Sequence, residues 1–157
     1  KGVDLLISAF KNLKLNNWKL YLVGNGEHIE DFKAQAKGNN NIYFTGNINN
    51  KDLINLIKKT KIFVLPSRNA EGHPKALIEA LAAGNICIAS NVIGNKDVIK
   101  DNYNGYLFQT NSLLDLQEKI KMAIELNKID VKNVISSVEH LKLDNFIVNK
   151  LKIYENL

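Results

Sequence analysis

Over its first 108 residues the sequence alternates short apolar runs with longer amphipathic stretches. The runs read as continuously apolar, which is typical of strands that are buried on both faces of a parallel sheet. They lie at residues 19–23, 42–45, 62–65, 86–89 and 105–108. Because helical stretches separate these runs, the pattern predicts an α/β fold: a Rossmann-like, doubly wound parallel sheet with helices on both faces.

Helical periodicity fills the segments between the strands. We predict helices at residues 3–14, 27–37, 51–59 and 74–83, and a short turn at 96–99. Beyond Asn111 the chain turns helical, with helices at 113–124, 131–140 and 144–156. A length of 157 residues fits one domain that needs no disulfide or metal. The single cysteine, Cys87, lies in an apolar run and is predicted to be a small core side chain.

The net charge of +5 comes almost wholly from lysine, because Arg68 is the only arginine. Proteins that bind nucleic acid usually use arginine forks or interleaved aromatic residues, whereas these lysines are scattered. The charge therefore argues against a nucleic-acid partner and predicts a mild attraction to nucleotide phosphates or acidic lipid headgroups. No run approaches the roughly 18 apolar residues that span a bilayer. The chain opens at Lys1 without methionine, so we expect further residues upstream.

The segment that says most about function is residues 66–84, which follow a predicted strand and include the next predicted helix. Ligands of doubly wound sheets bind outside the carboxyl ends of the strands, where this segment begins. Gly72 lets the backbone approach a ligand closely, and Pro74 suits the first helical position. The free amides and the positive dipole at that helix start predict a phosphate-binding site.

Two glutamates flank this predicted site: Glu71 in the loop, and Glu79 about one turn into the helix. Carboxylates hydrogen-bond vicinal hydroxyls well, so each glutamate is a candidate for holding one sugar ring, on either side of the phosphate. The alternatives are a solvated loop charge for Glu71 and an i,i+4 ion pair with Lys75 for Glu79. On spacing alone these alternatives stay open.

The two glutamates also match an E-x7-E pattern, through which the chain resembles the retaining glycosyltransferases of the GT-B fold, specifically glycosyltransferase family 4, also called group 1. The resemblance runs along the whole chain in order. It includes a KG-x-D-x-L-x-x-A opening at 1–9, a VGxG strand end at 23–26 and an I-x-F-x-G segment at 42–46. Residues 89–105 are similar to A-S-D-V-G-G-x-x-E-x-I-x-D-G-x-N-G, and residues 154–157 to a closing Y-E-x-L.

The resemblance implies roles for individual residues. Glu71 would contact hydroxyls of the transferred sugar, Glu79 would bind the ribose of the nucleotide, and Lys1 would neutralise the donor diphosphate. Glu71 and Lys1 are the implied catalytic residues. Ile48 would lie near the base, with a plain core contact as the alternative. The other implied donor-binding positions are Gly24, Gly72 and the backbone of His73, Pro74 and Lys75.

The expected chemistry needs no metal ion. Breaking a glycosyl–phosphate bond builds charge on the leaving diphosphate, so a nearby cation and helix dipole stabilise the transition state. The sequence has no D-x-D pattern, and His28, His73 and His140 lack the spacing of metal ligands. We therefore expect no cofactor, a nucleotide diphosphate sugar as donor, and surface positions for His28 and His140.

The chain departs from the family pattern in the stretch after residue 89. Ile93 stands where the first glycine of a Gly-Gly pair is common, Asp97 replaces a glutamate, and Asn102 replaces a glycine. The substitutions at positions 93, 97 and 102 leave the predicted fold intact but affect the expected shape of the loop after residue 89.

At the other end of the chain, an arginine that the family places a few residues before the Lys-Gly pair would lie upstream of Lys1.

We therefore predict that residues 1–157 form the nucleotide-sugar-binding, C-terminal domain of a GT-B enzyme, whose N-terminal acceptor domain is absent from this chain. The parent enzyme would transfer a sugar with retention of configuration in the cytoplasm, either free or at the inner face of the membrane. We expect the isolated domain to be inactive, and the base, sugar, acceptor and oligomeric state stay open. The alternatives are a non-catalytic nucleotide-binding module and a dinucleotide-dependent oxidoreductase. Ile29 opposes the latter, because it replaces the third glycine of the fingerprint.

Overall fold

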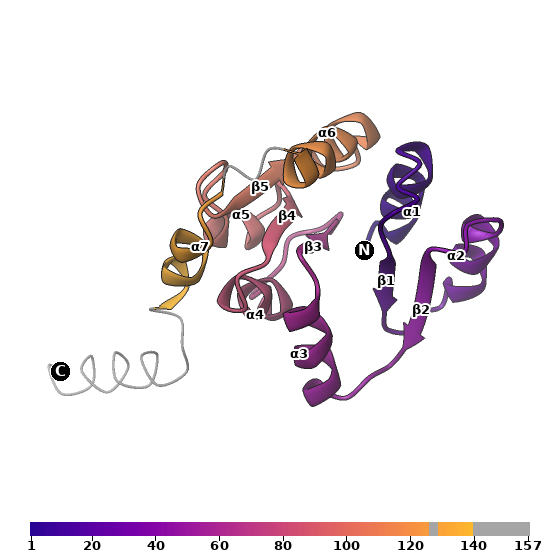
Figure 1. Cartoon of the computed structure of the whole chain (residues 1–157), viewed down its shortest axis with the longest axis horizontal. Coiled ribbons are helices and arrows are strands. Elements are labelled where there is room, and N and C mark those ends of the chain that lie inside the picture. The colour runs from indigo at the N-terminus through magenta and orange to yellow at the C-terminus, as the bar shows by residue number, and fades with distance from the viewer. Residues whose placement is uncertain (126–128, 140–157) are drawn as a thin grey trace, which may run out of the picture.

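The computed structural model of the chain describes residues 1–125 and 129–139 (Figure 1). The helix predicted at 144–156, the closing motif at 154–157 and His140 lie outside these residues. The helices are α1 (Val3–Asn12), α2 (Ile29–Ala36), α3 (Asn50–Lys59), α4 (Lys75–Ala82), α5 (Asn95–Val98), α6 (Leu113–Glu125) and α7 (Val131–Ser137). The strands are β1 (Leu20–Val23), β2 (Ile42–Gly46), β3 (Ile62–Leu65), β4 (Ile86–Ser90) and β5 (Gly105–Phe108). Each matches a predicted element, with ends shifted by a few residues.

All strand pairings are parallel, which confirms the predicted fold class. The strands do not form one continuous ladder, however. β1 pairs with β2 in one sheet, and β3, β4 and β5 form a second sheet in that order. Among the described residues no strand joins β1 to β3, so the single sheet expected from the pattern is divided between them.

The helices form two layers, one on each side of the strands (Figure 1). On one side α1 packs against both α2 and α6, and on the other α4 packs against both α3 and α7. The three-stranded sheet lies between α6, which contacts β4 and β5, and α4, which contacts β3 and β4. Helices therefore cover both of its faces, as predicted for a doubly wound sheet. No helix in the described ranges is long and apolar enough to cross a membrane.

The centre of the core is formed by β4 and α4. Every residue of β4 is buried, and Leu77, Ala80 and Leu81 on the inward stripe of α4 are inaccessible to solvent. Cys87 is fully buried within β4, and this burial raises the pKa of its thiol far above the usual range. The prediction that Cys87 is a core side chain is therefore confirmed.

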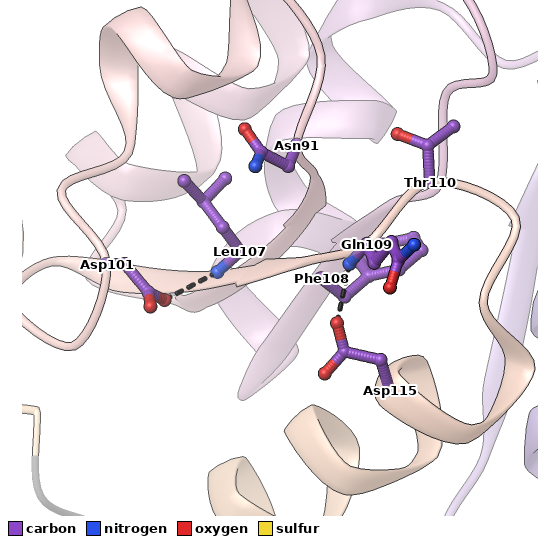
Figure 2. A pocket seen from close by; sticks show the side chains of 7 residues that line it. All are labelled: Asn91, Asp101, Leu107, Phe108, Gln109, Thr110 and Asp115. Atoms are coloured by element: carbon purple, nitrogen blue, oxygen red, sulfur yellow. Dashed lines mark hydrogen bonds between the residues drawn. The ribbon is translucent and has the colours of Figure 1, made fainter.

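Two aspartates satisfy the free edge of β5 (Figure 2). Asp101 Oδ1 accepts a hydrogen bond from the Leu107 amide at 2.8 Å, and Asp115 Oδ2 accepts one from the Gln109 amide at 2.6 Å. These amides point away from β4, so they would otherwise be unpaired at the sheet edge. A hollow of about 620 Å³ lies beside this edge, but none of the predicted site residues lines it.

Replacing Leu77 with alanine should destabilise the domain by about 2–5 kcal/mol, because the substitution leaves a cavity between α4 and the sheet. Chemical denaturation measures the difference from wild type. The matched control is Leu114→Ala, because Leu114 also lies on a helix but is 79% exposed. We expect the control to stay within about 0.5 kcal/mol of wild type, and equal effects of the two substitutions would contradict the described core.

Candidate functional site

The site forms where the carboxyl end of β3 meets the start of α1. Gly2 adopts a left-handed backbone conformation with φ +75°, and a Cβ atom there would lie 2.2 Å from the carbonyl oxygen of Pro66, which directly follows β3. Only glycine permits this approach. The contact places Lys1 at the carboxyl end of the sheet, beside the loop that carries Glu71.

Glu71 and Lys1 are in direct contact. The Lys1 ammonium donates to Glu71 Oε1 at 2.5 Å, and the Ser67 hydroxyl donates to the same oxygen. The Glu71 side chain is only 18% exposed, so it is not the solvated loop charge that the sequence left open. The structure therefore brings together the two residues that the family resemblance implies to be catalytic.

The hydrogen bonds to Glu71 change the pKa of its carboxyl group. Burial raises this pKa, whereas the hydrogen bonds from Lys1 and Ser67 and the positive charge of the Lys1 side chain lower it. The lowering effects prevail, so the carboxylate is ionised at neutral pH and can accept hydrogen bonds from sugar hydroxyls. Because its pKa is lower in the folded state, Glu71 stabilises the fold above its unfolded pKa, and this stabilisation is lost as the pH falls through the folded pKa.

A second glycine contact positions the Glu71 backbone. The Glu71 amide donates at 2.9 Å to the carbonyl of Ile93, in the loop after β4. Gly94 has φ +88°, and a Cβ atom there would lie 2.0 Å from the Glu71 carbonyl oxygen. The loops after β3 and β4 are thus in backbone contact, which restricts the directions available to the Glu71 side chain.

Buried polar residues from β4 and α5 hold Ser67 in turn. The Ser90 hydroxyl donates to the Ser67 carbonyl at 2.5 Å, and the Asn95 side-chain amide donates to the Ser90 carbonyl at 3.1 Å. All three side chains are buried. Reasoning from the sequence missed their part in the site, although Ser90 and Asn95 lie within the family-like stretch at 89–105.

Arg68 joins three segments at the edge of the site. Its guanidinium donates to Asp4 on α1 at 2.5 Å, and to Asn111, just before α6, at 3.0 Å. Arg68 therefore ties the first turn of α1 to the loop after β3, next to the contact between Lys1 and Glu71. As a lone arginine in the sequence it gave no sign of this role.

Helix α4 begins one residue later than predicted, so that Pro74 is its N-cap rather than its first residue. Pro74 is buried, whereas Gly72, His73 and Lys75 are exposed. Within the described part of the chain, no group accepts a hydrogen bond from the amides of Gly72 or His73. Unpaired amides next to the positive end of a helix dipole suit a phosphate group, and the phosphate site stays a prediction.

Glu79 has different partners from Glu71. It lies 3.7 Å from the ammonium of Lys75, which is the i,i+4 ion pair left open by the sequence. Its side chain also lines a small groove between α3 and α4, together with Ile54 and Ile57. The structure shows no contact between Glu79 and the Lys1–Glu71 pair, so its role in binding ribose stays a prediction.

Gly24 and Ile48 lie at the carboxyl ends of the two-stranded sheet. The Gly24 amide donates to the Gly46 carbonyl at 2.9 Å, and the Asn25 amide donates to the Asn47 side chain at 3.1 Å. The loops after β1 and β2 are therefore joined. Ile48 is half-buried and lies outside the hydrophobic core cluster, which disfavours the plain core contact but does not test a contact with a base.

His28 and His73, the two histidines that the structure describes, show no metal-binding arrangement. His28 is exposed and lies 3.4 Å from Asp31, which confirms its predicted surface position. Within residues 1–125 and 129–139, no three histidine, cysteine, aspartate or glutamate side chains gather as metal ligands would. Transfer without a metal ion stays a prediction.

The fold and the site define a class of protein: a parallel α/β domain that presents a carboxylate, a cation and a helix start at the carboxyl ends of its strands. The sequence assigns it more narrowly, since residues 1–141 match the family described as "Glycosyl transferases group 1". The chain therefore belongs to the group 1 glycosyltransferases. This membership decides against the oxidoreductase alternative.

Individual relatives agree with this assignment. The chain is 31% identical to an uncharacterized glycosyltransferase of Methanocaldococcus jannaschii, covering 100% of the chain and 42% of that protein. It is also 31% identical to the UDP-Gal:alpha-D-GlcNAc-diphosphoundecaprenol alpha-1,3-galactosyltransferase of Escherichia coli, covering 87% of the chain and 34% of the relative. A solved glycosyltransferase structure from Rickettsia africae is 26% identical, with a TM-score of 0.81, covering 99% of this chain and 44% of that one. The chain thus spans less than half the length of these proteins and corresponds to part of a GT-B enzyme.

Removing the Ser67 hydroxyl should raise the pKa of Glu71, because one of the two side-chain donors to its carboxylate is lost. Carbon-13 NMR of the Glu71 carboxyl group against pH measures the shift in Ser67→Ala. Ser136→Ala is the matched control, because the Ser136 hydroxyl is exposed and donates to the Asn133 carbonyl on α7. An unchanged Glu71 titration in Ser67→Ala would show that this hydrogen bond is absent in solution.

Proposed function

We propose that this chain is the nucleotide-sugar-binding, C-terminal domain of a family 4 glycosyltransferase, and that the longer protein transfers a sugar with retention of configuration. One observation carries the proposal: Lys1, Ser67 and Glu71 meet at the carboxyl end of β3, next to the loop that leads into α4. A cation for a diphosphate and a carboxylate for a sugar therefore share one location.

The donor diphosphate would bind between Lys1 and the start of α4. When the glycosyl–phosphate bond breaks, the leaving diphosphate gains negative charge. The Lys1 ammonium and the unpaired amides of Gly72 and His73 would attract this charge more strongly than they attract the intact donor. Interactions that strengthen in the transition state accelerate the reaction, and no metal ion is needed for this role.

Glu71 would bind the hydroxyls of the transferred sugar. Lys1 and Ser67 both donate to Oε1, and among the described residues Oε2 has no hydrogen-bond partner. Oε2 is therefore available to accept from a sugar hydroxyl while Oε1 stays held in place. A carboxylate positioned by two donors orients the sugar with little loss of side-chain entropy on binding.

Glu79 would bind the ribose once its ion pair with Lys75 opens. The Lys75 side chain is 75% exposed, and exposed ion pairs on helices contribute little to stability, so the pair can open at little cost. Gly24 and Ile48, at the joined loops after β1 and β2, are the proposed neighbours of the base. Their position at the carboxyl ends of the strands is where ligands of such sheets bind.

The E. coli relative is named for a UDP-sugar donor and a lipid-linked acceptor. By analogy we propose a UDP-sugar donor and a glycolipid or polysaccharide acceptor, with the parent enzyme in the cytoplasm at the inner face of a membrane. The N-terminal domain of the parent would bind the acceptor. The chain alone would then bind the donor without transferring its sugar.

A thermal-shift panel tests donor binding by the chain. A nucleotide sugar at about 100 times its dissociation constant should stabilise the fold by roughly 2.7 kcal/mol. We expect the melting temperature to rise with UDP-glucose or UDP-galactose, to change less with the GDP and ADP sugars, and to stay constant with NAD. If no nucleotide sugar stabilises the chain, the proposal is wrong.

Single-charge variants test the two proposed contacts. Lys1→Met should weaken donor binding by about tenfold or more through loss of the diphosphate contact, and Glu79→Gln should do the same through loss of the ribose contact. Calorimetric titration with the best nucleotide sugar measures the dissociation constants. The controls are Lys121→Met and Glu118→Gln, which remove like charges from exposed positions of α6. Equal affinity of Glu79→Gln and Glu118→Gln would show that Glu79 serves only as the ion-pair partner of Lys75.

A further inference from the structure

The sequence contains two asparagine–glycine pairs, Asn25–Gly26 and Asn104–Gly105. In such a pair the backbone nitrogen of the glycine can attack the side-chain carbonyl carbon of the asparagine, because glycine has no side chain to obstruct the approach. The sequence alone does not distinguish the two pairs. The structure does, because it places them in opposite environments.

Hydrogen bonds hold the side chain of Asn104 in place. Asn104 is 1% exposed, and its Oδ1 atom accepts a hydrogen bond from the Lys100 amide at 2.8 Å. Its Nδ2 atom donates to the Val98 carbonyl at 3.0 Å and to the Ser137 hydroxyl at 2.9 Å. Gly105 begins β5 and pairs with β4. The Asn104 side chain therefore cannot turn toward the Gly105 nitrogen without breaking these hydrogen bonds.

The other pair is free of such contacts. Asn25 and Gly26 are both exposed, and they lie in the loop after β1, outside any helix or strand. Among the described residues the Asn25 side chain makes no hydrogen bond, although it lies against Gly46. The Gly26 amide has no acceptor in the described ranges either. Both reacting groups of this pair are therefore available to each other.

Nothing in the described fold requires glycine at position 26. A Cβ atom there would meet no other atom within 4 Å. Gly26 does not have a positive φ, so its backbone suits other residues. Gly24 and Gly46, by contrast, have φ +111° and +66°. The glycine that makes Asn25 reactive can therefore be replaced without disturbing the loop.

We propose that Asn25 is a modification site, at which spontaneous deamidation converts the side-chain amide into a carboxylate. Asparagine is among the thermolabile residues of proteins. The Gly26 nitrogen attacks the Asn25 Cγ atom and loses its proton, and the bond from Cγ to Nδ2 breaks, so that ammonia leaves and a cyclic imide remains. Water then opens the imide at either carbonyl carbon. The products are aspartate and isoaspartate, and water is the only other reactant.

Deamidation would change the loop in charge and in length. The Asn25 amide donates to the Asn47 side chain at 3.1 Å, which joins the loops after β1 and β2. Aspartate adds a negative charge next to the exposed Glu27, and isoaspartate also lengthens the backbone by a methylene group. A carboxylate here would repel a diphosphate. This consequence rests on the proposed function, which places the base near Gly24 and Ile48.

Incubation of the chain at neutral pH and physiological temperature tests the proposal. Peptide mass spectrometry measures conversion at each asparagine over time, and isoaspartate-specific methylation measures the isomer. Asn104 is one internal control, because it must open locally before it reacts, so we expect Asn25 to react at least about tenfold faster. Asn17 is the other, because it is exposed like Asn25 but is followed by Trp18. Asn17 should also react more slowly than Asn25.

The variant Gly26→Ala separates the chemistry from the fold. It should slow conversion of Asn25 several-fold and leave the melting temperature unchanged, because the added methyl group obstructs ring closure but meets no neighbour. Equal conversion of Asn25 and Asn104, or an unaltered rate in Gly26→Ala, would contradict the proposal. So would aspartate without isoaspartate, because that result indicates direct hydrolysis by water rather than an imide.

The same incubation of the longer natural protein shows whether Asn25 is accessible there. Conversion in both proteins is the expected result. If Asn25 reacts only in the isolated chain, its exposure belongs to the isolated chain and the proposal is wrong.

The variant Asn25→Asp tests the consequence for donor binding separately. It carries the new charge from the start, so it should weaken binding of UDP-glucose several-fold, whereas Asn17→Asp should not. Calorimetric titration measures both. Unchanged affinity of Asn25→Asp would count against the proposed donor position, whereas the incubation alone decides whether Asn25 is modified.

Discussion

The approach of Gly2 to the carbonyl of Pro66 is the constraint on which the site depends. Because a side chain at position 2 would overlap that oxygen, α1 can begin against the end of β3 only with glycine there. The contact is between backbone atoms, so it does not depend on a rotamer. It places the Lys1 ammonium beside Glu71, while Arg68 holds the first turn of α1 through Asp4. The backbone of Lys1 is therefore positioned by the fold, and its side chain reaches Glu71 from there.

Much of this architecture could be predicted from the sequence, because strands and helices leave periodic apolar patterns. The loop that carries Glu71 and the helix that carries Glu79 were found in this way. The hydrogen bonds of Ser67, Ser90 and Asn95 were not, since a polar side chain that bonds a neighbouring loop leaves no periodic signal. The division of the sheet was also missed. An apolar run predicts a strand but does not identify the neighbours of that strand.

The departures from the family pattern proved compatible with an ordered loop. Asp97, in place of a glutamate, accepts from the Gly94 amide at 3.0 Å. Asn102, in place of a glycine, has φ +62°, and asparagine tolerates that left-handed conformation better than most residues. Ile93 is exposed, and the site uses only its carbonyl oxygen, which any residue can provide. Each of the three residues therefore contributes a defined backbone contact or conformation to this loop.

The two aspartates that accept hydrogen bonds from the edge of β5 have a consequence for how copies of this chain behave together. A sheet grows when the backbone of one molecule adds to the edge of another, and a helix or loop often blocks such growth by its bulk. Here two carboxylates block it by occupying the amides that an incoming strand would use. The protection of this edge therefore depends on two side chains, at positions 101 and 115, that lie outside the Lys1–Glu71 site.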